Sequence, residues 1–385
     1  MKKREFGSLR RIGSGRWQAR YLDPAGLRRT APTTFATKAE ALRWLSAAQT
    51  DMARGGWQDP QLGDVAFREW AERFLASRVD LKPKTLSDYE SLLHARILPK
   101  FAEWPIGRIR PMDVQDWIAA MTADGLSASR VRQGAHLLGS ILSAAVNEGM
   151  IPTNPAQQAR LPRLPRREME FYDAEQVERL ASAAASPYGT LIHVLAYGGL
   201  RFGEAAALRR GACDLDRGRL IVRESLADVR GQLHFGSTKT HQRREIVLPT
   251  FLVELMVGHL EAHVAPEPSA LVFTSPRGGP LRYGNFLRNI WVPALRAAHL
   301  PATGVHILRH TCATLLISQG APVKAIQAQL GHASPELTLG RYGHLYPDDL
   351  DALAVRLDAA RASALKQTKV QELEPPELDP PGTSW

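Results

Sequence analysis

The chain has 385 residues, of which 44% are apolar and 23% are charged, and its formal net charge is +10. The length predicts two or three domains instead of one core, and the composition excludes a chain that is disordered throughout. The surplus of positive charge favours a polyanionic partner, either nucleic acid or an acidic membrane surface, although a basic and merely well-solvated surface gives the same balance.

The sequence carries no sign of export, membrane insertion or thiolate metal binding. The basic N-terminus has no apolar run behind it, and no stretch approaches the roughly 18 apolar residues of a membrane span. The two cysteines, Cys213 and Cys312, form no CxxC pair, which argues against a disulfide framework and a thiolate zinc site. We therefore expect a cytoplasmic protein without membrane association.

Residues 1–60 form a basic segment that is predicted to be a small sheet followed by a helix. Up to residue 54 it holds twelve Lys and Arg against four Asp and Glu. The turns GSG and DPAG separate three short strands, and Thr37 with Glu40 forms a capping box for the helix. An Arg-rich sheet with Trp17 and Tyr21 among the charges suits a module that reads a DNA groove; a solvated edge sheet is the alternative. The expected DNA contacts are Arg11, Arg16, Arg20, Arg28 and Arg29.

The segment 63–155 is predicted to be a bundle of four amphipathic helices. Phe67, Trp70 and Phe74 recur on one helix face at i, i+3 and i+7. The later helices are expected to run from Pro83 to about Pro99, from Pro111, and from Ser127 to Gly149. Basic and hydroxyl side chains gather at two of the helix starts, where they and the backbone amides could bind phosphate; solvated helix ends are the alternative. The expected contacts are Lys82, Lys84, Thr85, Arg130 and Arg132.

The run at 151–168 has four prolines and many basic residues. It predicts a semi-extended linker, which we place at 156–168. A second domain of mixed structure is expected at 169–365. The acidic, proline-rich tail at 366–385 is predicted to be disordered.

The second domain holds residues suited to cutting a phosphodiester. That reaction needs fixed cations around the phosphorus, an acid for the leaving alkoxide and an in-line nucleophile. Arginine suits the first task because its guanidinium is always charged and binds phosphate oxygens in pairs. In LAYGGLRFGEAAAL, Arg201 begins a helix and Glu204, one turn on, could hold its side chain; an isolated surface ion pair is the alternative.

Further candidates follow along the chain. Lys239 falls in a turn between two strand-like runs, although a turn lysine alone is usually just solvated. His306 and Arg309 share a helix face at i, i+3, and Tyr342 follows ten residues after His332.

A metal or nucleotide site is not expected. His306 and His310 have i, i+4 spacing, but Ile307 stands where a zinc protease would have Glu, and no third ligand is evident. The ATP-binding pattern GxxxxGK[ST] does not occur. The sequence therefore predicts neither a metal nor any other cofactor.

The order of these candidates resembles the tyrosine recombinase family, also called the phage integrases. The matching contexts are GGLRFGE, TKT, HILRH and LGHASPELTLGRYGH, and the helical segment contributes KPKTLSDYESLLHARILP. The family pattern of Arg, hairpin Lys, His-x-x-Arg, His or Trp, and Tyr is filled by Arg201, Lys239, His306, Arg309, His332 and Tyr342.

The resemblance implies a multidomain α+β fold. Residues 1–60 would be an arm-type DNA-binding domain, a small three-stranded sheet plus a helix. Residues 63–155 would be a four-helix core-binding domain of the SAM-like kind. Residues 169–365 would be the catalytic domain, mainly helical with a small antiparallel sheet.

The resemblance also implies that Tyr342 attacks a backbone phosphate, forms a 3′-phosphotyrosyl bond and releases a 5′-hydroxyl. Arg201 and Arg309 would hold the non-bridging oxygens. A phenol has a pKa of about 10, so these cations would be needed near neutral pH. Because the phosphotyrosine conserves the bond energy, rejoining would need neither ATP nor metal. Tyr346 is the rival nucleophile, but the family spacing after LGH favours Tyr342.

The remaining residues would assist. Lys239 would be the general acid toward the leaving 5′-oxygen, and His306 would help proton transfer. His332 would donate a hydrogen bond to the phosphate, and Glu204 would support the arginine beside it.

The expected function is a site-specific integrase that inserts a phage or mobile element into a chromosome, because the basic N-terminal sheet is an addition that chromosome-resolving relatives usually lack. A resolvase or excisionase-type recombinase, a type IB-like topoisomerase and a non-catalytic DNA-binding protein are the alternatives. Expected partners are double-stranded DNA attachment sites, a homotetramer on DNA, a DNA-bending host factor and a directionality factor. The apolar stripe of Leu350, Leu353 and Leu357 would pack on its own domain or dock on a neighbouring protomer.

Overall fold

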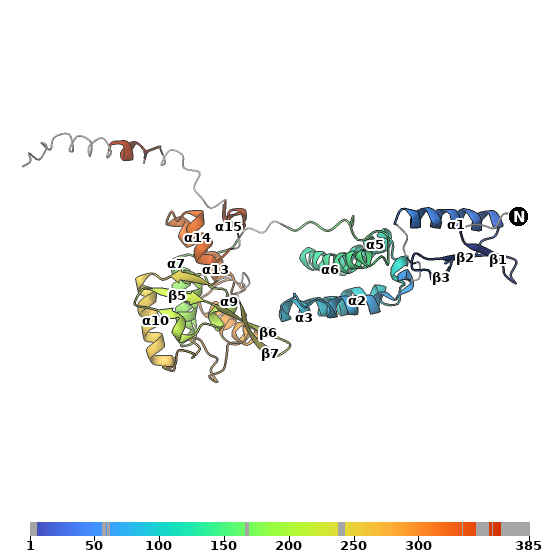
Figure 1. Ribbon diagram of the computed structural model, residues 1–385. Helices are drawn as coiled ribbons and strands as arrows, with labels where there is room; N and C mark the ends of the chain where they lie inside the picture. Colours follow the sequence, from blue (N-terminus) through green and yellow to red (C-terminus); the bar gives the residue numbers. More distant parts are fainter. Residues whose placement is uncertain are drawn as a thin grey trace, which may run out of the picture. The chain divides into compact units, whose positions relative to one another are not determined.

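The computed structural model (Figure 1) describes residues 6–55, 59, 62–165, 169–237, 243–332, 334–343, 354–355 and 357–362. The chain divides into two compact units, and each is described by itself. The first comprises residues 1–168 and 228–234, and the second comprises residues 169–227 and 235–385.

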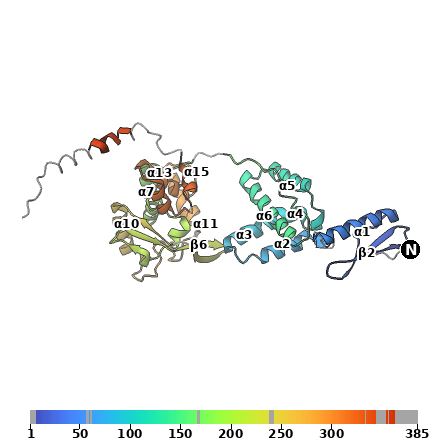
Figure 2. The ribbon, with the colours of Figure 1, turned by 45° about the horizontal axis from the view of Figure 1, so that its top comes forward.

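A three-stranded antiparallel sheet with one helix begins the first unit (Figure 2). Helix α1 (Lys38–Ala53) packs against the middle strand, and Ala19, Tyr21 and Leu45 are buried between them. The strands are β1 (Ser8–Arg11), β2 (Trp17–Leu22) and β3 (Arg28–Thr30). The predicted sheet-plus-helix arrangement is therefore confirmed.

Two local expectations for this segment have opposite outcomes. Thr37 Oγ1 accepts a hydrogen bond from the Glu40 amide at 3.2 Å, and the Glu40 carboxylate accepts one from the Thr37 amide at 3.3 Å, so the capping box is confirmed. The placement of Tyr21 among the charges was wrong. Alternation along β2 turns Tyr21 with Ala19 toward α1, where its ring lies 5.4 Å from that of Trp44.

Helices make up the rest of the first unit. A π-helical turn at Leu93–Ile97 joins α3 to α4, so the helix that was expected to end near Pro99 continues to Phe101. Two short 3₁₀ turns lie at Leu62–Asp64 and Ile106–Arg108. The helices are α2 (Phe67–Ala76), α3 (Pro83–Leu92), α4 (Leu98–Phe101), α5 (Pro111–Ala123) and α6 (Ala128–Asn147).

Aromatic side chains fill the core between these helices. The predicted i, i+3, i+7 face of α2 is confirmed, because Phe67 and Trp70 are buried and Phe74 packs against the same core. The Phe101 ring lies 6.0 Å from that of Phe67 and 5.8 Å from that of Trp117. The indole N–H of Trp70 donates to the carbonyl of Ile141 at 3.0 Å, so its polar atom is satisfied inside the core.

Part of the expected linker packs on the helical bundle. Ala156, Ala159 and Leu161 contact its core. The Gln115 side chain and the Arg160 backbone exchange two hydrogen bonds, of 2.9 and 3.3 Å. The placement of the linker at 156–168 stays a prediction.

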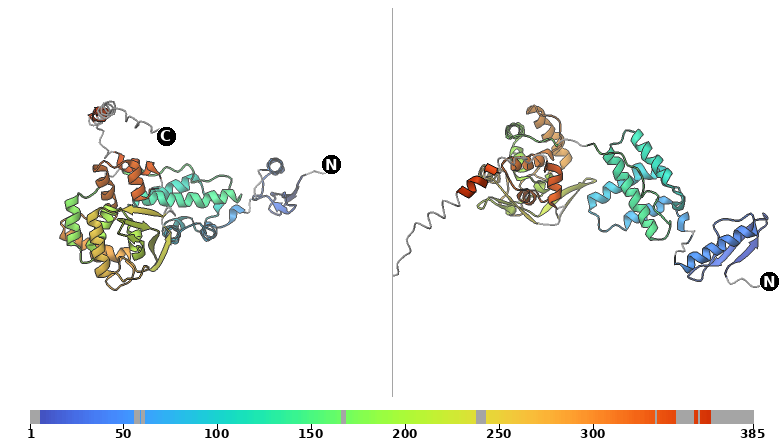
Figure 3. Two further views of the ribbon diagram at one scale, coloured as in Figure 1. Left: turned by 60° about the vertical axis from the view of Figure 1, so that its left-hand side comes forward. Right: turned by 90° about the horizontal axis from the view of Figure 1, so that it is seen from above.

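The second unit combines helices with two small sheets (Figure 3). Its strands are β4 (Cys213–Asp214), β5 (Arg219–Val222) and β8 (Arg244–Val247), with the larger part of β6 (Glu224–Val229) and half of β7 (Gln232–Ser237), because residues 228–234 belong to the first unit. Its helices are α7 (Ala174–Ala183), α8 (Tyr188–Gly198), α9 (Phe202–Ala206), α10 (Thr250–His263), α11 (Tyr283–Phe286), α12 (Val292–Ala297), α13 (Ile307–Ser318), α14 (Val323–Leu330) and α15 (Pro335–Tyr342). A 3₁₀ turn occupies Arg210–Ala212, and a π-helical turn occupies Leu287–Trp291.

Helix α8 is central to this unit. It packs between α7 and α13, and nearly all of its side chains are buried. Strand β5 pairs with β4 and with β8, and the facing residues Leu220 and Ile246 are fully buried. The mainly helical domain with a small antiparallel sheet, and with it the α+β fold class, is confirmed.

The C-terminal part of the chain is described only in pieces. Residues 354–355 and 357–362 are helical, and Val355 and Leu357 are exposed. Leu350, Leu353 and the tail at 366–385 lie outside the described residues, so the packing of the apolar stripe stays a prediction. Within the described ranges, no helix is both long enough and apolar enough to cross a membrane.

Phe101→Ala should destabilise the helical bundle by about 3–5 kcal/mol, because it empties a fully buried site between aromatic rings. Hydrogen exchange on the full chain should show faster exchange across α2, α5 and α6. Met112→Ala, at an exposed position on α5, is the matched control. Equal protection in the two variants would contradict the assigned core.

Candidate active site

Glu204 joins two arginines at the start of α9. Its carboxylate accepts hydrogen bonds from the backbone amide of Arg201 at 2.9 Å and from the guanidinium of Arg201 at 2.8 Å. From β8, Arg244 donates two further bonds to the same carboxylate, at 3.0 and 2.6 Å. The Glu204 side chain is 1% exposed. The expected pairing of Glu204 with Arg201 is thus present, and it is buried instead of lying on the surface.

The charge of Glu204 is maintained by its partners. Burial raises the pKa of this carboxyl, but the hydrogen bonds and charges of Arg244 and Arg201 act in the opposite direction, and the net pKa is about 2. Glu204 is therefore ionised throughout the physiological range and offsets two positive charges that would otherwise repel each other.

Arg309 is held by backbone carbonyls instead of by a carboxylate. Its guanidinium donates to the carbonyl of Gly199 and to the carbonyl of Leu330, each at 2.6 Å. These carbonyls lie at the C-terminal ends of α8 and α14, where the helix dipole is negative. A guanidinium has five N–H donors, so these two bonds hold Arg309 without exhausting its donors.

Two glycines make this arrangement possible. Gly199 and Gly331 follow the ends of α8 and α14 with φ of +69° and +65°, in the left-handed region. A Cβ at Gly199 would lie 2.6 Å from Leu330, and one at Gly331 would lie 2.7 Å from the Arg244 side chain. Both turns therefore need glycine, which gives Gly199, the second residue of the GG pair, a more specific reason than chain breaking.

Arg309 lies within electrostatic range of the other charged groups. Burial, followed by the charges of Arg201 and Arg244, lowers the pKa of Arg309 to about 9, while Glu204 and Tyr342 act against the shift. Arg309 remains protonated at neutral pH. Three arginines, one carboxylate and one phenol therefore interact within one part of the second unit.

Tyr342 is the last residue of α15 and is buried. Its hydroxyl lies 2.7 Å from Nδ1 of His310. The ring of His332 stacks on the Tyr342 ring, with 6.5 Å between centroids and 8° between planes, and His332 Nδ1 is hydrogen-bonded to Thr338 Oγ1 at 2.8 Å.

His306 differs from the sequence expectation. His306 is the N-cap residue before α13 and its side chain is exposed, whereas the Arg309 side chain is buried. The two side chains therefore do not lie on one face of the helix. The His306 ring lies 4.9 Å from that of His310. His310 thus contacts both His306 and Tyr342. Two other candidates, Lys239 between β7 and β8 and Tyr346 after α15, lie outside the described residues.

Two residues of this arrangement were missed in the sequence. Arg244 stands in the run QRREIVLP, and the strand alternation there would have placed it on the same side as the buried Ile246. His310 was considered only as a metal ligand paired with His306. Its position next to Arg309 and one turn after His306 was the available signal.

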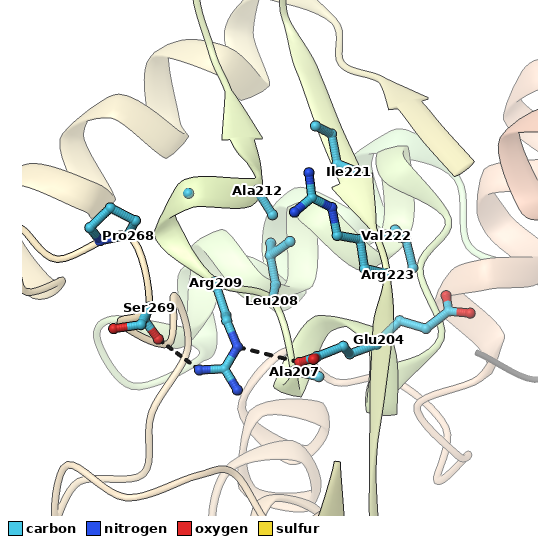
Figure 4. Close-up of a pocket in the computed structure, with 12 residues that line it drawn as sticks. Glu204, Ala207, Leu208, Arg209, Ala212, Ile221, Val222, Arg223, Pro268 and Ser269 are labelled. Atoms are coloured by element: carbon cyan, nitrogen blue, oxygen red, sulfur yellow. Dashed lines mark hydrogen bonds and ion pairs between the residues drawn. The ribbon is translucent and has the colours of Figure 1, made fainter. Parts of the chain in front are cut away.

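A separate pocket of about 300 Å³ has Glu204 in its lining (Figure 4). Arg209, which also lines it, is bonded to Glu224 at 3.3 Å and to the Ser269 carbonyl at 2.8 Å, and Arg223, between β5 and β6, lines it as well. Glu204 lines this pocket, but none of the described candidate catalytic residues does, so we do not place the active site in it. Among the described residues, no group of three or more His, Cys, Asp or Glu side chains is placed to hold a metal ion.

The expected DNA contacts of the N-terminal sheet fall on different faces. The β2 partner of Arg28 is Leu22, and Arg20 and Leu22 both point away from α1. Arg29 pairs with the inward Tyr21 and makes ion pairs with Asp23 at 2.9 Å and Asp59 at 2.7 Å. Arg11 and Arg16 form local bonds to Gly15 and Thr34, respectively.

The expected contacts of the helical bundle lie at two helix starts. Lys82 is the N-cap of α3, and Lys84 forms a surface pair with Asp88. Thr85 is half-buried in the same first turn. In α6, Arg130 donates to Gln133, and Arg132 donates to the carbonyl of Pro162 at 3.2 Å. Arg132 therefore also anchors the linker segment.

Family models match three consecutive parts of the chain. Residues 5–54 match the phage integrase N-terminal domain, residues 66–122 match the phage integrase N-terminal SAM-like domain, and residues 170–348 match the phage integrase family. A putative prophage phiRv2 integrase of Mycobacterium tuberculosis is 31% identical over 351 residues, which cover 89% of this chain and 92% of the relative. The chain belongs to the phage integrase family of tyrosine recombinases.

Other similar proteins agree with the assignment of this chain to the phage integrase family. The integrase of Mycobacterium phage D29 is 27% identical over 88% of this chain and 92% of its own length. The Tn1549 transposon integrase in complex with a circular intermediate DNA has a TM-score of 0.65 at 20% identity, covering 76% of this chain and 99% of that one. A lambda integrase dimer bound to a core site has a TM-score of 0.57 at 19% identity, covering 90% and 97%. These structures share the fold of the recombinase.

Glu204→Gln should make the stability of the catalytic part of the recombinase less dependent on pH. The folded pKa of Glu204 is depressed, so its contribution is present above the unfolded value and is lost as the pH falls toward 2. The stability difference between wild type and variant should shrink by about 3 kcal/mol between pH 6 and pH 2. Calorimetric unfolding at several pH values measures it. Glu175→Gln, an exposed carboxylate on α7, is the control, and a constant difference at Glu204 would contradict the buried cluster.

Proposed function

We propose that this tyrosine recombinase is a site-specific integrase that cuts and rejoins DNA through a 3′-phosphotyrosyl intermediate and inserts a phage or other mobile element into a chromosome. One observation carries the proposal: Arg201, Arg309 and His332 are gathered with the hydroxyl of Tyr342 in one part of the catalytic unit. The similarity to phage and prophage integrases, which includes the N-terminal domain, supports integration over other uses of the same chemistry.

The arginines would bind the scissile phosphate. Arg201 and Arg309 would hold the non-bridging oxygens and stabilise the negative charge that grows in the transition state. Glu204, Arg244 and the carbonyls at the ends of α8 and α14 fix both guanidiniums, so little reorganisation would be needed when the phosphate arrives.

Tyr342 would be the nucleophile. Its phenol oxygen would bond to phosphorus while the bond to the 5′-oxygen breaks. Lys239, which lies between β7 and β8 in the sequence, would protonate the leaving oxygen. His306 would assist proton transfer, and His332 would donate a hydrogen bond to the phosphate. The covalent intermediate keeps the energy of the phosphodiester, so rejoining would require neither ATP nor metal.

Two alternatives lead to different expectations. A resolvase or excisionase-type recombinase would use the same site, but the arm-type sheet at the N-terminus favours an integrase. A non-catalytic DNA-binding protein would leave the buried arginine cluster beside Tyr342 without a purpose. The proposed domains are residues 1–60 for arm sites, 63–155 for the core site and 169–365 for catalysis, joined by 156–168.

Tyr342→Phe should abolish covalent trapping of DNA. Wild-type protein incubated with a nicked suicide substrate carrying its attachment site should form a covalent adduct without metal or ATP, and gel electrophoresis under denaturing conditions detects that adduct. Tyr346→Phe is the matched control and should trap DNA normally. The assignment of the nucleophile is wrong if Tyr346→Phe abolishes the adduct and Tyr342→Phe preserves it. The absence of any adduct on an authentic site would favour the binding-only alternative.

The helix-free face of the N-terminal sheet is the proposed arm-site surface. The residues of β2 on that face are Gln18, Arg20 and Leu22, and their cross-strand partners include Arg10 and Arg28. Arg29, by contrast, is engaged by Asp23 and Asp59. We therefore propose Arg10, Arg20 and Arg28 as principal contacts of this sheet, with Arg11 and Arg16 at its turn.

Replacing Arg10, Arg20 and Arg28 together by Ala should weaken arm-site binding. The salt dependence of binding should also fall, by about one unit of slope for each phosphate that the variant no longer neutralises. The matched control removes the same charge from α1 through Lys38→Ala, Arg43→Ala and Arg54→Ala. Fluorescence anisotropy at several salt concentrations measures both. Equal weakening in the two triple variants would indicate general charge attraction and would contradict a defined face.

The proposal includes assembly on DNA. A homotetramer would bring two attachment sites together. A lambda integrase tetramer bound to a Holliday junction shares the fold. An apolar groove of about 760 Å³ lined by residues of β8, α13 and α14 would receive the C-terminal helix of a neighbouring protomer, in which Val355 and Leu357 are exposed. A DNA-bending host factor and a directionality factor complete the proposed partners.

A further inference from the structure

The proposed mechanism gives no role to His310, although this residue contacts the Tyr342 hydroxyl. His310 Nδ1 and the Tyr342 hydroxyl are 2.7 Å apart, the distance of a short hydrogen bond. We propose that His310 is the base that takes the proton of Tyr342 as the phenol attacks DNA, and that it returns this proton when the strand is rejoined. The inference rests on the proposed function of the site.

The structure holds His310 firmly in its place on α13. The preceding residue, Arg309, is fixed by the carbonyls of Gly199 and Leu330. The following residue, Thr311, is fully buried, and its hydroxyl accepts a hydrogen bond from the Tyr172 amide at 2.9 Å. Because both neighbours are anchored, the imidazole presents Nδ1 to Tyr342 with little freedom, as a group that exchanges a proton requires.

The groups around the imidazole suit proton exchange. His306 contacts it from the start of α13, and Tyr342 contacts it from α15. His332 stacks on the phenol ring of Tyr342. Arg309 also interacts electrostatically with Tyr342. Positive charge near the phenol favours its ionised form, and histidine is the side chain suited to accept a proton near neutral pH.

The step balances without any further reactant. The O–H proton of Tyr342 moves to His310 Nδ1, the phenolate oxygen bonds to phosphorus, and the bond from phosphorus to the 5′-oxygen breaks. The 5′-oxygen takes a proton from Lys239. In the reverse step, the 5′-hydroxyl returns its proton to Lys239 as its oxygen bonds to phosphorus. The bond from phosphorus to the Tyr342 oxygen breaks, and protonated His310 gives its proton back to that oxygen.

A purely restraining contact predicts the opposite effect of mutation. If His310 only kept Tyr342 in its buried position, removing the hydrogen bond would free the phenol and speed adduct formation. If His310 is the base, removing it slows adduct formation by about 100-fold or more. The sign of the change therefore separates the two roles.

The test is single-turnover adduct formation on a suicide substrate with either oxygen or sulfur at the bridging 5′ position. His310→Asn keeps an amide near Nδ1 but cannot accept a proton. This variant should form the adduct slowly on both substrates. A sulfur leaving group needs no acid, but the proton of Tyr342 still has no base to accept it. Lys239→Ala should be slow on oxygen and restored on sulfur. His263→Asn, on the exposed end of α10, is the matched control and should match wild type.

The outcomes are distinct. Adduct formation by His310→Asn at the wild-type rate or faster overturns the proposal, and so does restoration of this variant by sulfur, which would place His310 on the leaving-group side. DNA affinity equal to that of wild type shows that the variant is folded. Failure of wild type to form any adduct would instead refute the proposed function.

A measurement on unmutated protein keeps the test valid should the variant not fold. On the sulfur substrate, the wild-type rate should fall as the pH is lowered from 8 to 5, because a protonated imidazole cannot accept the phenol proton. His306 contacts His310 and His332 contacts Tyr342, so the acid limb is assigned to His310 if it persists in His306→Asn and in His332→Asn. A wild-type rate that does not change between pH 5 and pH 8 overturns the proposal.

Discussion

The catalytic part of the molecule depends on one buried carboxylate. Without Glu204, Arg201 and Arg244 would place two positive charges in contact inside the protein, and Arg309 adds a third within electrostatic range. Such a cluster is stable only when the charges are paired and hydrogen-bonded. Glu204, in the first turn of α9, pairs with Arg201 and Arg244. Carbonyls at the ends of α8 and α14 accept hydrogen bonds from Arg309.

This constraint explains features far from the cluster in sequence. The glycines after α8 and α14 are needed because their turns aim carbonyls at Arg309 and leave room for Arg244. Helix α13 carries Arg309 and His310 on consecutive residues, so the position of Arg309, the proposed phosphate-binding cation, also sets the position of the group that contacts Tyr342. The result is a site that is largely organised before DNA binds, which is how electrostatic catalysis avoids reorganisation.

Several features of the fold and the site could be predicted from the sequence, because each depends on residues close together in the chain. The capping box at Thr37, the helix start at Pro111 and the pair formed by Arg201 and Glu204 each depend on residues within one helical turn. Arg244 and His310 have partners 40 and 32 residues away, so local patterns could indicate that each side chain faces inward or lies near the site, but not which residue it contacts. Tyr21 was placed wrongly for a similar reason. Strand register, which the sequence does not state, turns Tyr21 and its partner Arg29 to the side of the sheet on which α1 packs.

The most direct measurement is a structure of the covalent complex trapped on a nicked attachment site. We expect a phosphate bonded to Tyr342, with guanidinium nitrogens of Arg201 and Arg309 about 3 Å from its non-bridging oxygens. We also expect Glu204 to keep its bonds to Arg201 and Arg244, unchanged from the free protein. A phosphate bonded to another residue, or arginines that must leave Glu204 and the helix-end carbonyls to reach it, would contradict a site that is organised in advance.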